Sequence, residues 1–359
     1  MITSATLDNF KCFKRLDLPD LSRITLLGGR NNVGKTAVLE ALAIFYGRVG
    51  PQMFYKYLAW RGIGSISNTN DFVIGPLFRD YQMDNKISIS ISEGDHKEIM
   101  EIEFHPTYLH RVVEKPLANG DNNNLQNIVS DDLYSPYIVD ITYKSNEGQE
   151  RKAQVTNDSG ISEVRGDQSL LYPQQVVYVG AGTRPNSDVD VFRFGQLDIV
   201  GKQDIVLEFL KILEPRLQSL SSIAVGQKLL IHGDIGIGRK IPLAHMGEGI
   251  GRLLSIVLAI AVSKDGLILI DEFEHGIHHS GMVKIWEGIS KMAQEYNCQI
   301  IATTHSYECL QAAFEGTSNA ELTGDFRYIR LDRSEQGIVA KTFTHTMIGA
   351  AIERGWEVR

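Results

Sequence analysis

The pattern of hydrophobic and polar positions changes twice along the chain. Residues 1–30 read as three short strands, and segment 36–46 then carries apolar residues on nearly every side of a helix. Such a helix is expected to be buried. From about 71 to 170 apolar and polar residues alternate as in strands, and buried strands and helices follow again after it. The pattern predicts an α/β core, at 1–70 and 171–359, with an inserted β-rich lobe at 71–170.

Two β-hairpins are expected within the lobe. Segments 87–91 and 99–104 alternate strictly and are separated by a Glu-Gly-Asp turn. Segments 137–143 and 151–155 repeat this arrangement around an Asn-Glu-Gly turn. The pattern predicts the fold of this lobe but indicates no function for it.

A glycine-rich stretch from Gly233 to Gly238 superficially resembles a dinucleotide-binding fingerprint. No helix follows it at the required spacing, and Pro242 interrupts the next segment. A hairpin turn between strands at 228–232 and 239–243 is therefore favoured. The other expected elements outside the motifs are a helix at 204–213, strands at 176–179, 326–331 and 337–343, and a helix at 347–354.

Residues 29–36, GRNNVGKT, fit the pattern GxxxxGK[ST] of a phosphate-binding loop. The loop follows an apolar strand and opens the buried helix, and this context separates it from an ordinary glycine turn. Glycines let backbone N–H groups face one anion, and the helix N-terminus adds partial positive charge. We expect Lys35 to bridge the β- and γ-phosphates and Thr36 to hold Mg²⁺. The predicted nucleotide-binding residues are Gly29, Asn31, Asn32, Gly34, Lys35 and Thr36.

A buried strand at 267–270 ends on two carboxylates, Asp271 and Glu272. Four apolar residues in a row suit a central parallel strand, and ligands of such sheets lie at the carboxyl ends of strands. Asp271 can organise Mg²⁺, and Glu272 can accept a proton from the attacking water. Combined with the phosphate loop, the two carboxylates predict hydrolysis of a nucleoside triphosphate.

His305 follows another buried strand in the same way. We expect its imidazole beside the γ-phosphate, where it can hydrogen-bond the phosphate or the attacking water. Three further histidines, His275, His278 and His279, raise the alternative of a structural metal site. The HExxH order is absent and the segment directly follows the carboxylates, so a loop beside the nucleotide is favoured.

A second glycine-rich loop, with Gly247, Glu248 and Gly249, precedes another buried helix. Its backbone N–H groups can form a second anion cradle at a helix N-terminus. One triphosphate does not need two cradles from one chain. We therefore expect the second cradle to close the site of a second subunit.

Composition and charge narrow the class of protein. The chain has 359 residues, 43% of them hydrophobic and 22% charged, with a net charge of −8. The acidic balance argues against a general nucleic-acid binder but leaves a local basic groove open. The three cysteines show no CxxC spacing, the apolar run 253–262 is too short to span a membrane, and the N-terminus shows no export signal. We expect a cytoplasmic protein without a membrane partner.

The motifs, in this order, resemble ABC-type ATPases of the SMC, RecF and OLD group, and especially OLD-like AAA-family ATPases of bacterial anti-phage defence. The matching segments are 9–13, 29–36, 39–41, 247–254, 271–278 and 303–306. They lie on both sides of the lobe, which remains unmatched. The resemblance implies a P-loop ABC-ATPase head with a central, mostly parallel sheet, an antiparallel β subdomain and the inserted lobe.

The resemblance also implies roles for single residues. Two heads would enclose two ATP molecules, with the phosphate loop of each facing the signature loop, Gly247 to Gly249, of the other. Asp271 would be the Walker B acid, Glu272 the base and His305 the switch histidine.

The signature loop departs from the family pattern. Related loops carry a serine that reaches the γ-phosphate, whereas Gly247 and Glu248 stand around that position here. The contact with the partner's nucleotide is therefore expected through backbone alone, with slow turnover. The candidates for the glutamine loop are Gln174 and Gln175.

The expected partners are a second copy of the chain and a separate effector. OLD nucleases carry a TOPRIM domain after the switch histidine, but the segment that follows Ser306 is too short for one. The chain has no long heptad region, so SMC-like coiled-coil arms are not expected. We expect a head that forms a dimer or larger oligomer around ATP and gates an effector in anti-phage defence or a toxin–antitoxin pair. A RecF-like DNA-binding repair protein and a scaffold held together by ATP remain alternatives.

Overall fold

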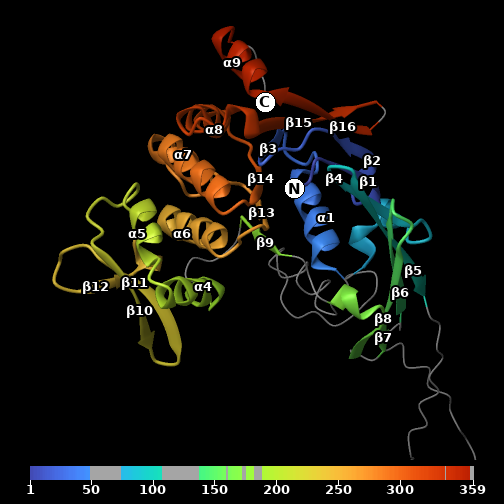
Figure 1. Cartoon of the computed structure of the whole chain (residues 1–359), viewed down its shortest axis with the longest axis horizontal. Coiled ribbons are helices and arrows are strands. Elements are labelled where there is room, and N and C mark those ends of the chain that lie inside the picture. Colours follow the sequence, from blue (N-terminus) through green and yellow to red (C-terminus); the bar gives the residue numbers. More distant parts are fainter. Residues whose placement is uncertain are drawn as a thin grey trace, which may run out of the picture.

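The computed structural model describes residues 1–48, 74–106, 137–158, 161–171, 175–181, 188–335 and 337–355. Its centre is a six-stranded sheet with the order β16-β15-β3-β14-β13-β9 (Figure 1). Neighbouring strands are parallel except for β16, which runs antiparallel to β15. The strands are β3 (Ile24–Gly29), β9 (Val176–Val179), β13 (Leu267–Ile270), β14 (Gln299–Thr303), β15 (Phe326–Ser334) and β16 (Gly337–Thr344). The expected α/β core with a mostly parallel sheet is confirmed.

A second sheet is antiparallel throughout and has the order β2-β1-β4-β5-β6-β7-β8. Its strands are β1 (Ser4–Phe10), β2 (Phe13–Leu18), β4 (Ile87–Glu93), β5 (His96–Pro106), β6 (Tyr137–Ser145), β7 (Glu150–Asp158) and β8 (Ile161–Gly166). Both hairpins expected in the lobe, β4–β5 and β6–β7, are present. Because β4 pairs with β1, the strands expected in an inserted lobe extend the N-terminal sheet. The division into core and lobe stays a prediction.

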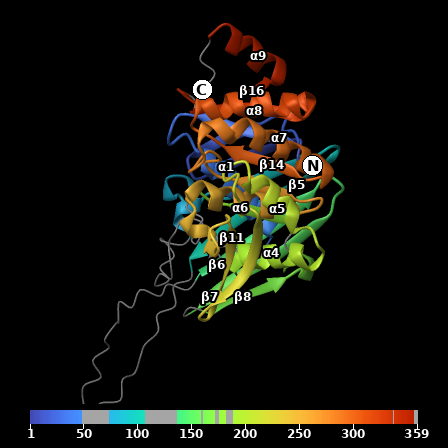
Figure 2. The ribbon, with the colours of Figure 1, turned by 90° about the vertical axis from the view of Figure 1, so that its left-hand side faces the viewer.

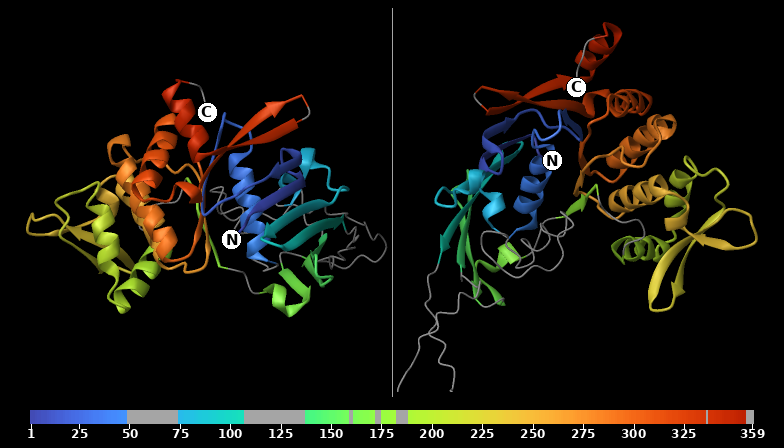
Figure 3. Two further views of the ribbon diagram at one scale, coloured as in Figure 1. Left: turned by 45° about the horizontal axis from the view of Figure 1, so that its top comes forward. Right: turned by 180° about the vertical axis from the view of Figure 1, so that it is seen from behind.

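Helix α1 (Lys35–Gly47) lies between the two sheets (Figures 1 and 3). Its residues from Ala37 to Tyr46 are all buried, which explains why its sequence is apolar on nearly every side. Each central strand serves two cores, because successive side chains point to opposite faces. In β13, for example, Leu269 packs with α1 and the antiparallel sheet, whereas Ile268 packs in the core on the other face.

An ion pair joins α1 to the turn between β1 and β2. Lys11 lies in this turn and pairs with Glu40 of α1, whose side chain is completely buried. A buried carboxylate needs such a partner. Lys11 and Glu40 belong to two segments that carried the family resemblance, 9–13 and 39–41, and the pair holds these segments together.

Helices cover the other face of the central sheet, with α6, α7 and α8 in front of it in Figure 2. The helices are α4 (Asp188–Ile199), α5 (Gln203–Leu210), α6 (Glu248–Ala261), α7 (His279–Glu295), α8 (Tyr307–Asn319) and α9 (His345–Glu353). Short 3₁₀ turns lie at Gly75–Leu77, Arg79–Tyr81, Gln168–Leu171, Leu243–His245 and Thr323–Asp325. None of the helices described is long and apolar enough to cross a membrane.

A small sheet of β10 (Ser219–Val225), β11 (Lys228–Asp234) and β12 (Lys240–Pro242) adjoins α4 and α5. Its β11–β12 hairpin confirms the turn expected for the glycine-rich stretch. Gly236 and Gly238 adopt φ values of 80° within that turn. Left-handed backbone of this kind favours glycine, so these glycines shape a turn rather than a dinucleotide site.

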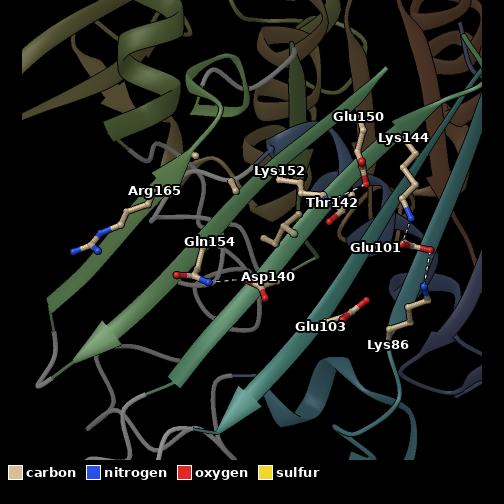
Figure 4. Close-up of a pocket in the computed structure, with 13 residues that line it drawn as sticks. Lys86, Glu101, Glu103, Asp140, Thr142, Lys144, Glu150, Lys152, Gln154 and Arg165 are labelled. Carbon is tan, nitrogen blue, oxygen red and sulfur yellow. Dashed lines mark hydrogen bonds and ion pairs between the residues drawn. The ribbon is translucent and has the colours of Figure 1, made fainter. Parts of the chain in front are cut away.

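The outer face of the antiparallel sheet is polar and slightly concave (Figure 4). It lines a hollow of about 520 Å³ with four basic and four acidic side chains: Lys86, Lys144, Lys152, Arg165, Glu101, Glu103, Asp140 and Glu150. Glu101 accepts from both Lys86 and Lys144 at 2.8 Å. Because the four basic and four acidic side chains balance in number, the residues that line this hollow have no net charge to attract a charged ligand.

The close packing of α7 on α8 generates a stability prediction. A Cβ atom on Gly316 of α8 would lie 2.5 Å from Cβ of Trp286 and 2.8 Å from the carbonyl oxygen of Val283, both in α7. We expect Gly316→Ala to lower the free energy of unfolding by about 1–3 kcal/mol, the usual cost of overpacking, in urea titrations. Gly195→Ala in α4 is the matched control, because nothing lies within 4 Å of its new Cβ. Gly195→Ala should raise the free energy of unfolding by roughly 0.5–1 kcal/mol. Equal effects of both substitutions would contradict the packing argument.

Candidate functional site

The loop between β3 and α1 has the backbone of a phosphate cradle. Gly29, Asn32 and Gly34 have φ values of 121°, 59° and 91°, and Gly34 directly precedes α1. The loop wraps around Lys35, whose Nζ donates to the carbonyl oxygens of Gly29 at 2.8 Å and Arg30 at 3.0 Å. The lysine thus folds back onto the carbonyl groups at the start of the loop.

Lys35 is surrounded by acidic side chains. Burial lowers the pKa of Lys35, and the carboxylates of Glu274, Asp271 and Glu272 oppose that shift. The buried guanidinium of Arg252 interacts with the same three carboxylates, so two cations among three carboxylates leave a local excess of one negative charge. A divalent cation would balance this excess, especially once a triphosphate is bound.

The two oxygen ligands expected for Mg²⁺ lie together. The Thr36 hydroxyl donates to Oδ1 of Asp271 at 2.9 Å and lies 3.1 Å from Oδ2. Thr303 donates to the same Oδ1 at 2.7 Å. Burial raises the pKa of Asp271, and the hydrogen bonds from these two hydroxyl groups oppose that shift only in part. A hydroxyl and a carboxylate at one point fit Mg²⁺, which usually takes one or two protein oxygens together with phosphates and water.

The histidines after Glu274 do not form a metal centre in the described structure. No group of three or more His, Cys, Asp or Glu side chains that could hold a metal occurs among the residues described. His278 instead precedes α7, where its Nδ1 accepts from the N–H of Ser280 at 3.3 Å. His275 contacts Glu248. Both histidines thus have partners within the protein, and the loop beside the nucleotide that the sequence favours stays a prediction.

Glu272 and His305 emerge at the same edge of the sheet. Glu272 has φ of 49°, an uncommon conformation for a residue other than glycine, and its N–H donates to Oγ1 of Thr303 at 2.7 Å. Its carboxylate is 44% exposed and the His305 imidazole 53% exposed. Both side chains are therefore accessible to solvent at this edge of the sheet.

The signature loop is held against the segment that follows Glu272. Oε1 of Glu248 lies 2.9 Å from Nε2 of His275, and a Cβ on Gly249 would lie 2.3 Å from the carbonyl oxygen of Gly276. Gly247 caps α6 with φ of 108°. None of the hydrogen bonds or ion pairs given for the described residues joins this loop to residues 29–36. The structure thus brings the phosphate loop, both carboxylates and His305 together, but not Gly247 to Gly249.

The sequence-based reasoning missed Arg252, which is central to the site. Its buried guanidinium donates from Nη1 to the carbonyl oxygen of Gly180 at 2.6 Å. Nη2 donates to the carbonyl oxygens of Asp271 and, at 3.2 Å, Glu272. Burial lowers the pKa of Arg252 to about 10. Through Arg252, helix α6 therefore holds the backbone at the carboxyl ends of β9 and β13. In the sequence, only the position of Arg252 within segment 247–254 indicated a role in the site.

The prediction of Gln175 as the glutamine-loop residue was wrong. Its carbonyl oxygen accepts from the N–H of Leu267, and its side chain donates to the carbonyl oxygen of Val262. Gln175 therefore lies at the amino end of β9, whereas Asp271 lies beside Val179 at the carboxyl end. Only the carboxyl edge of parallel strands faces the phosphate loop. The other candidate, Gln174, lies outside the described residues.

A basic pocket of about 670 Å³ adjoins the outer side of the phosphate loop. Its walls are residues 30–33 of the loop, residues 330–333 at the end of β15, and Lys341 of β16. Arg333 donates to the carbonyl oxygen of Asn32 at 3.1 Å, and Lys341 pairs with Asp332 at 2.9 Å. The pocket has four basic side chains and one acidic side chain, so this flank of the site carries a net positive charge.

A family model described as "AAA domain, putative AbiEii toxin, Type IV TA system" matches residues 24–310. The chain belongs to this AAA domain family. The match begins at β3 and ends in α8, so it includes the phosphate loop, the signature loop, Asp271, Glu272 and His305. The family and the fold together place the protein in the P-loop ATPase group, and ATP binding goes with that assignment.

Relatives agree with this assignment at the level of the fold. An "ATP/GTP phosphatase" of Helicobacter pylori is 23% identical over 96% of this chain and 95% of its own length. The Smc head bound to the C-terminal winged-helix domain of ScpA superposes with a TM-score of 0.53 at 13% identity, over 98% of this chain and 99% of that one. An Smc head bound to the C-terminal domain of ScpA derived from Pyrococcus furiosus gives 0.51 at 12%, over 98% of both chains. The expected P-loop ABC-ATPase fold is confirmed.

Arg252 generates the prediction for this site. Arg252→Met keeps an unbranched, apolar stem but removes the guanidinium, so two buried carbonyl oxygens and one part-buried carbonyl oxygen lose this donor. Since each unsatisfied buried group costs about 1–3 kcal/mol, we expect the free energy of unfolding to fall by at least about 2 kcal/mol in urea titrations. Arg216→Met, at an exposed pair with Glu214, is the control and should change it by no more than about 1 kcal/mol. A loss no larger than that of the control would show that Arg252 does not hold this backbone.

Proposed function

We propose that the protein binds and hydrolyses ATP as an ABC-type head, assembles with a second copy around ATP, and thereby gates a separate effector. One observation carries the proposal: the hydrogen-bonded cluster of Thr36, Asp271, Thr303 and Glu272, with Lys35 beside it. It combines a phosphate cradle, oxygen ligands for a divalent cation and an accessible base at one edge of the sheet. These are the parts that phosphoryl transfer to water requires.

Lys35 is the group that recognises the phosphates. Its Nζ now donates to the carbonyl oxygens of Gly29 and Arg30. A triphosphate in the loop offers stronger, charged acceptors, so the amine exchanges these carbonyl groups for phosphate oxygens. Partial burial strengthens that interaction, because the low dielectric of the site weakens electrostatic forces less than water does.

Thr36 and Asp271 would hold Mg²⁺. When bound, the ion neutralises charge that develops on the phosphate oxygens. Thr303 fixes the Asp271 carboxylate from the other side, at 2.7 Å. The two hydroxyl groups therefore keep this carboxylate aimed at the phosphate loop before any ligand arrives.

Glu272 is assigned as the general base and His305 as a hydrogen-bonding partner of the γ-phosphate or the attacking water. Thr303 also binds the N–H of Glu272, so one side chain orients both consecutive acids. The exposed carboxylate of Glu272 can take a proton from water at the open face of the phosphate loop. The imidazole of His305 is available there as well.

The position of the signature loop supports the proposed self-association. The N-terminus of α6 carries free N–H groups and Gly247, a combination suited to an anion, yet its contacts in the same chain run to His275 and Gly276. A second copy can bring this helix end to the phosphate, as in the OLD-like ATPases that the motifs resemble. The family description, which refers to a toxin system, supports a role in a toxin–antitoxin pair or in anti-phage defence.

Two variants separate binding from hydrolysis. We expect Lys35→Ala to weaken nucleotide binding by roughly two orders of magnitude, because hydrogen bonds to charged groups contribute about 1.5–3 kcal/mol each. Glu272→Gln should bind ATP but hydrolyse it on the order of 10²–10⁴ times more slowly. Equilibrium binding, phosphate release and light scattering with size exclusion are the measurements, with ATP and GTP in parallel because of the Helicobacter pylori relative.

The oligomeric state distinguishes the alternatives. ATP should convert Glu272→Gln to a stable dimer or larger oligomer and leave Lys35→Ala unchanged. Lys291→Ala is the control, since Lys291 lies on the surface of α7 and pairs with Glu287. Assembly with ATP but no phosphate release by the unaltered protein would favour the scaffold reading. Hydrolysis without any nucleotide-dependent assembly would contradict gating by a sandwich of two heads.

A further inference from the structure

Glu274 makes two contacts with one residue, His305, through a single carboxylate oxygen. Its Oε1 accepts from the backbone N–H of His305 at 2.8 Å and lies 3.0 Å from Nδ1 of the imidazole. The Glu274 side chain is only 8% exposed, whereas the His305 side chain is 53% exposed. The carboxylate is therefore inside the protein, and the imidazole extends from it to the surface of the site.

We propose that Glu274 is the positioning residue of His305: it holds the imidazole as the Nδ1–H tautomer and leaves Nε2 free to face the nucleotide. This inference rests on the proposed function for the role of His305, but the tautomer itself does not. An ionised carboxylate can only accept hydrogen bonds, so the ring nitrogen next to it carries the proton. The opposite nitrogen, Nε2, is then the acceptor of the neutral ring.

The fold explains how a carboxylate remains at this buried position. Glu274 follows the end of β13, and His305 follows the end of the adjacent parallel strand β14. Burying a carboxylate is costly unless donors and cations compensate it. The backbone N–H of His305 donates to Oε1, the imidazole lies beside the same oxygen, and Glu274 has the largest effect on Lys35 of the three carboxylates near it. Oε2 is buried and has no hydrogen-bond partner among the described residues, so these contacts compensate the charge only in part. The same carboxylate thus faces both His305 and the lysine of the phosphate loop.

Sharing one oxygen between backbone and ring has a mechanical consequence. A side-chain contact alone would leave the loop after β14 free to shift relative to the imidazole. Here the same Oε1 accepts from the N–H of His305 and contacts Nδ1, so one carboxylate oxygen acts on both the peptide and the ring. Glu274 also lies two residues after Glu272, and Phe273 between them donates from its N–H to the carbonyl oxygen of Thr303. A displacement of residues 271–274 would therefore move His305 as well.

The tautomer can be read directly by long-range ¹H–¹⁵N NMR of the full chain without nucleotide. The ten histidines are resolved by comparison with His305→Gln, which removes the signals of one of them. Below the temperature of unfolding and above the pH at which the ring is protonated, the unaltered protein should show a protonated Nδ1 and an unprotonated Nε2 at His305. An Nε2–H signature in the unaltered protein would overturn the proposal without any variant at Glu274.

Two substitutions then test the cause. Glu274→Ala removes the acceptor, so the ring should change towards Nε2–H, the form that free histidine prefers in water. Glu274→Gln retains an acceptor oxygen and should restore Nδ1–H. Glu248→Ala is the matched control, because it removes an acid from another histidine, His275, and should leave the His305 signals unchanged. An unchanged ring in Glu274→Ala, or loss of Nδ1–H in Glu274→Gln, would show that this carboxylate does not set the tautomer.

Hydrolysis gives the functional readout. We expect Glu274→Ala to lower kcat for ATP on the order of 10- to 100-fold with KM nearly unchanged, and Glu274→Gln to recover much of that loss. Equal kcat values for Glu274→Ala and the unaltered protein would overturn the positioning role. If the unaltered protein does not hydrolyse ATP but shows Nδ1–H at His305, the proposed function fails while the assignment of the tautomer stands.

Discussion

The hydrogen bonds from Thr36 to Asp271 are the interaction on which the site depends, because they join residues 235 positions apart in the chain. They require that β3 and β13 end at the same edge of one parallel sheet, with β14 between them. That arrangement requires both faces of the sheet to be covered, since its strands are apolar on both sides. The antiparallel sheet with α1 covers one face, and α6, α7 and α8 cover the other.

The polar residues of the site support one another in pairs across neighbouring strands. Thr303 of β14 orients Asp271 and the backbone of Glu272, and Glu274 in turn orients the loop that carries His305. Arg252 reaches the same segment from α6 and holds its carbonyl oxygens. Since α6 begins at the signature loop, contacts of that loop with a second copy would act on the helix that braces Asp271 and Glu272.

Much of the site was predictable because its parts are local. The phosphate loop needs glycines at fixed spacing before a helix, and a buried strand that ends in acids is visible as a run of apolar residues before Asp271. Arg252 and Glu274 were not anticipated, because each acts through a contact with a distant segment that leaves no periodic pattern. Gln175 failed for a related reason: the sequence predicts a strand at 176–179 but does not show which end of that strand faces the phosphate loop.

The sequence by itself determined the strands, the buried helix after the phosphate loop and the chemistry available at their ends, since these follow from spacing and hydrophobic period. Only the tertiary structure decided which of these ends meet. It joined the strands expected in a separate lobe to β1, turned Gly247 to Gly249 towards Gly276, and set Glu274 against His305. The physical reason is that strand order, and the pairing of buried polar groups that follows from it, depends on packing between segments far apart in the chain.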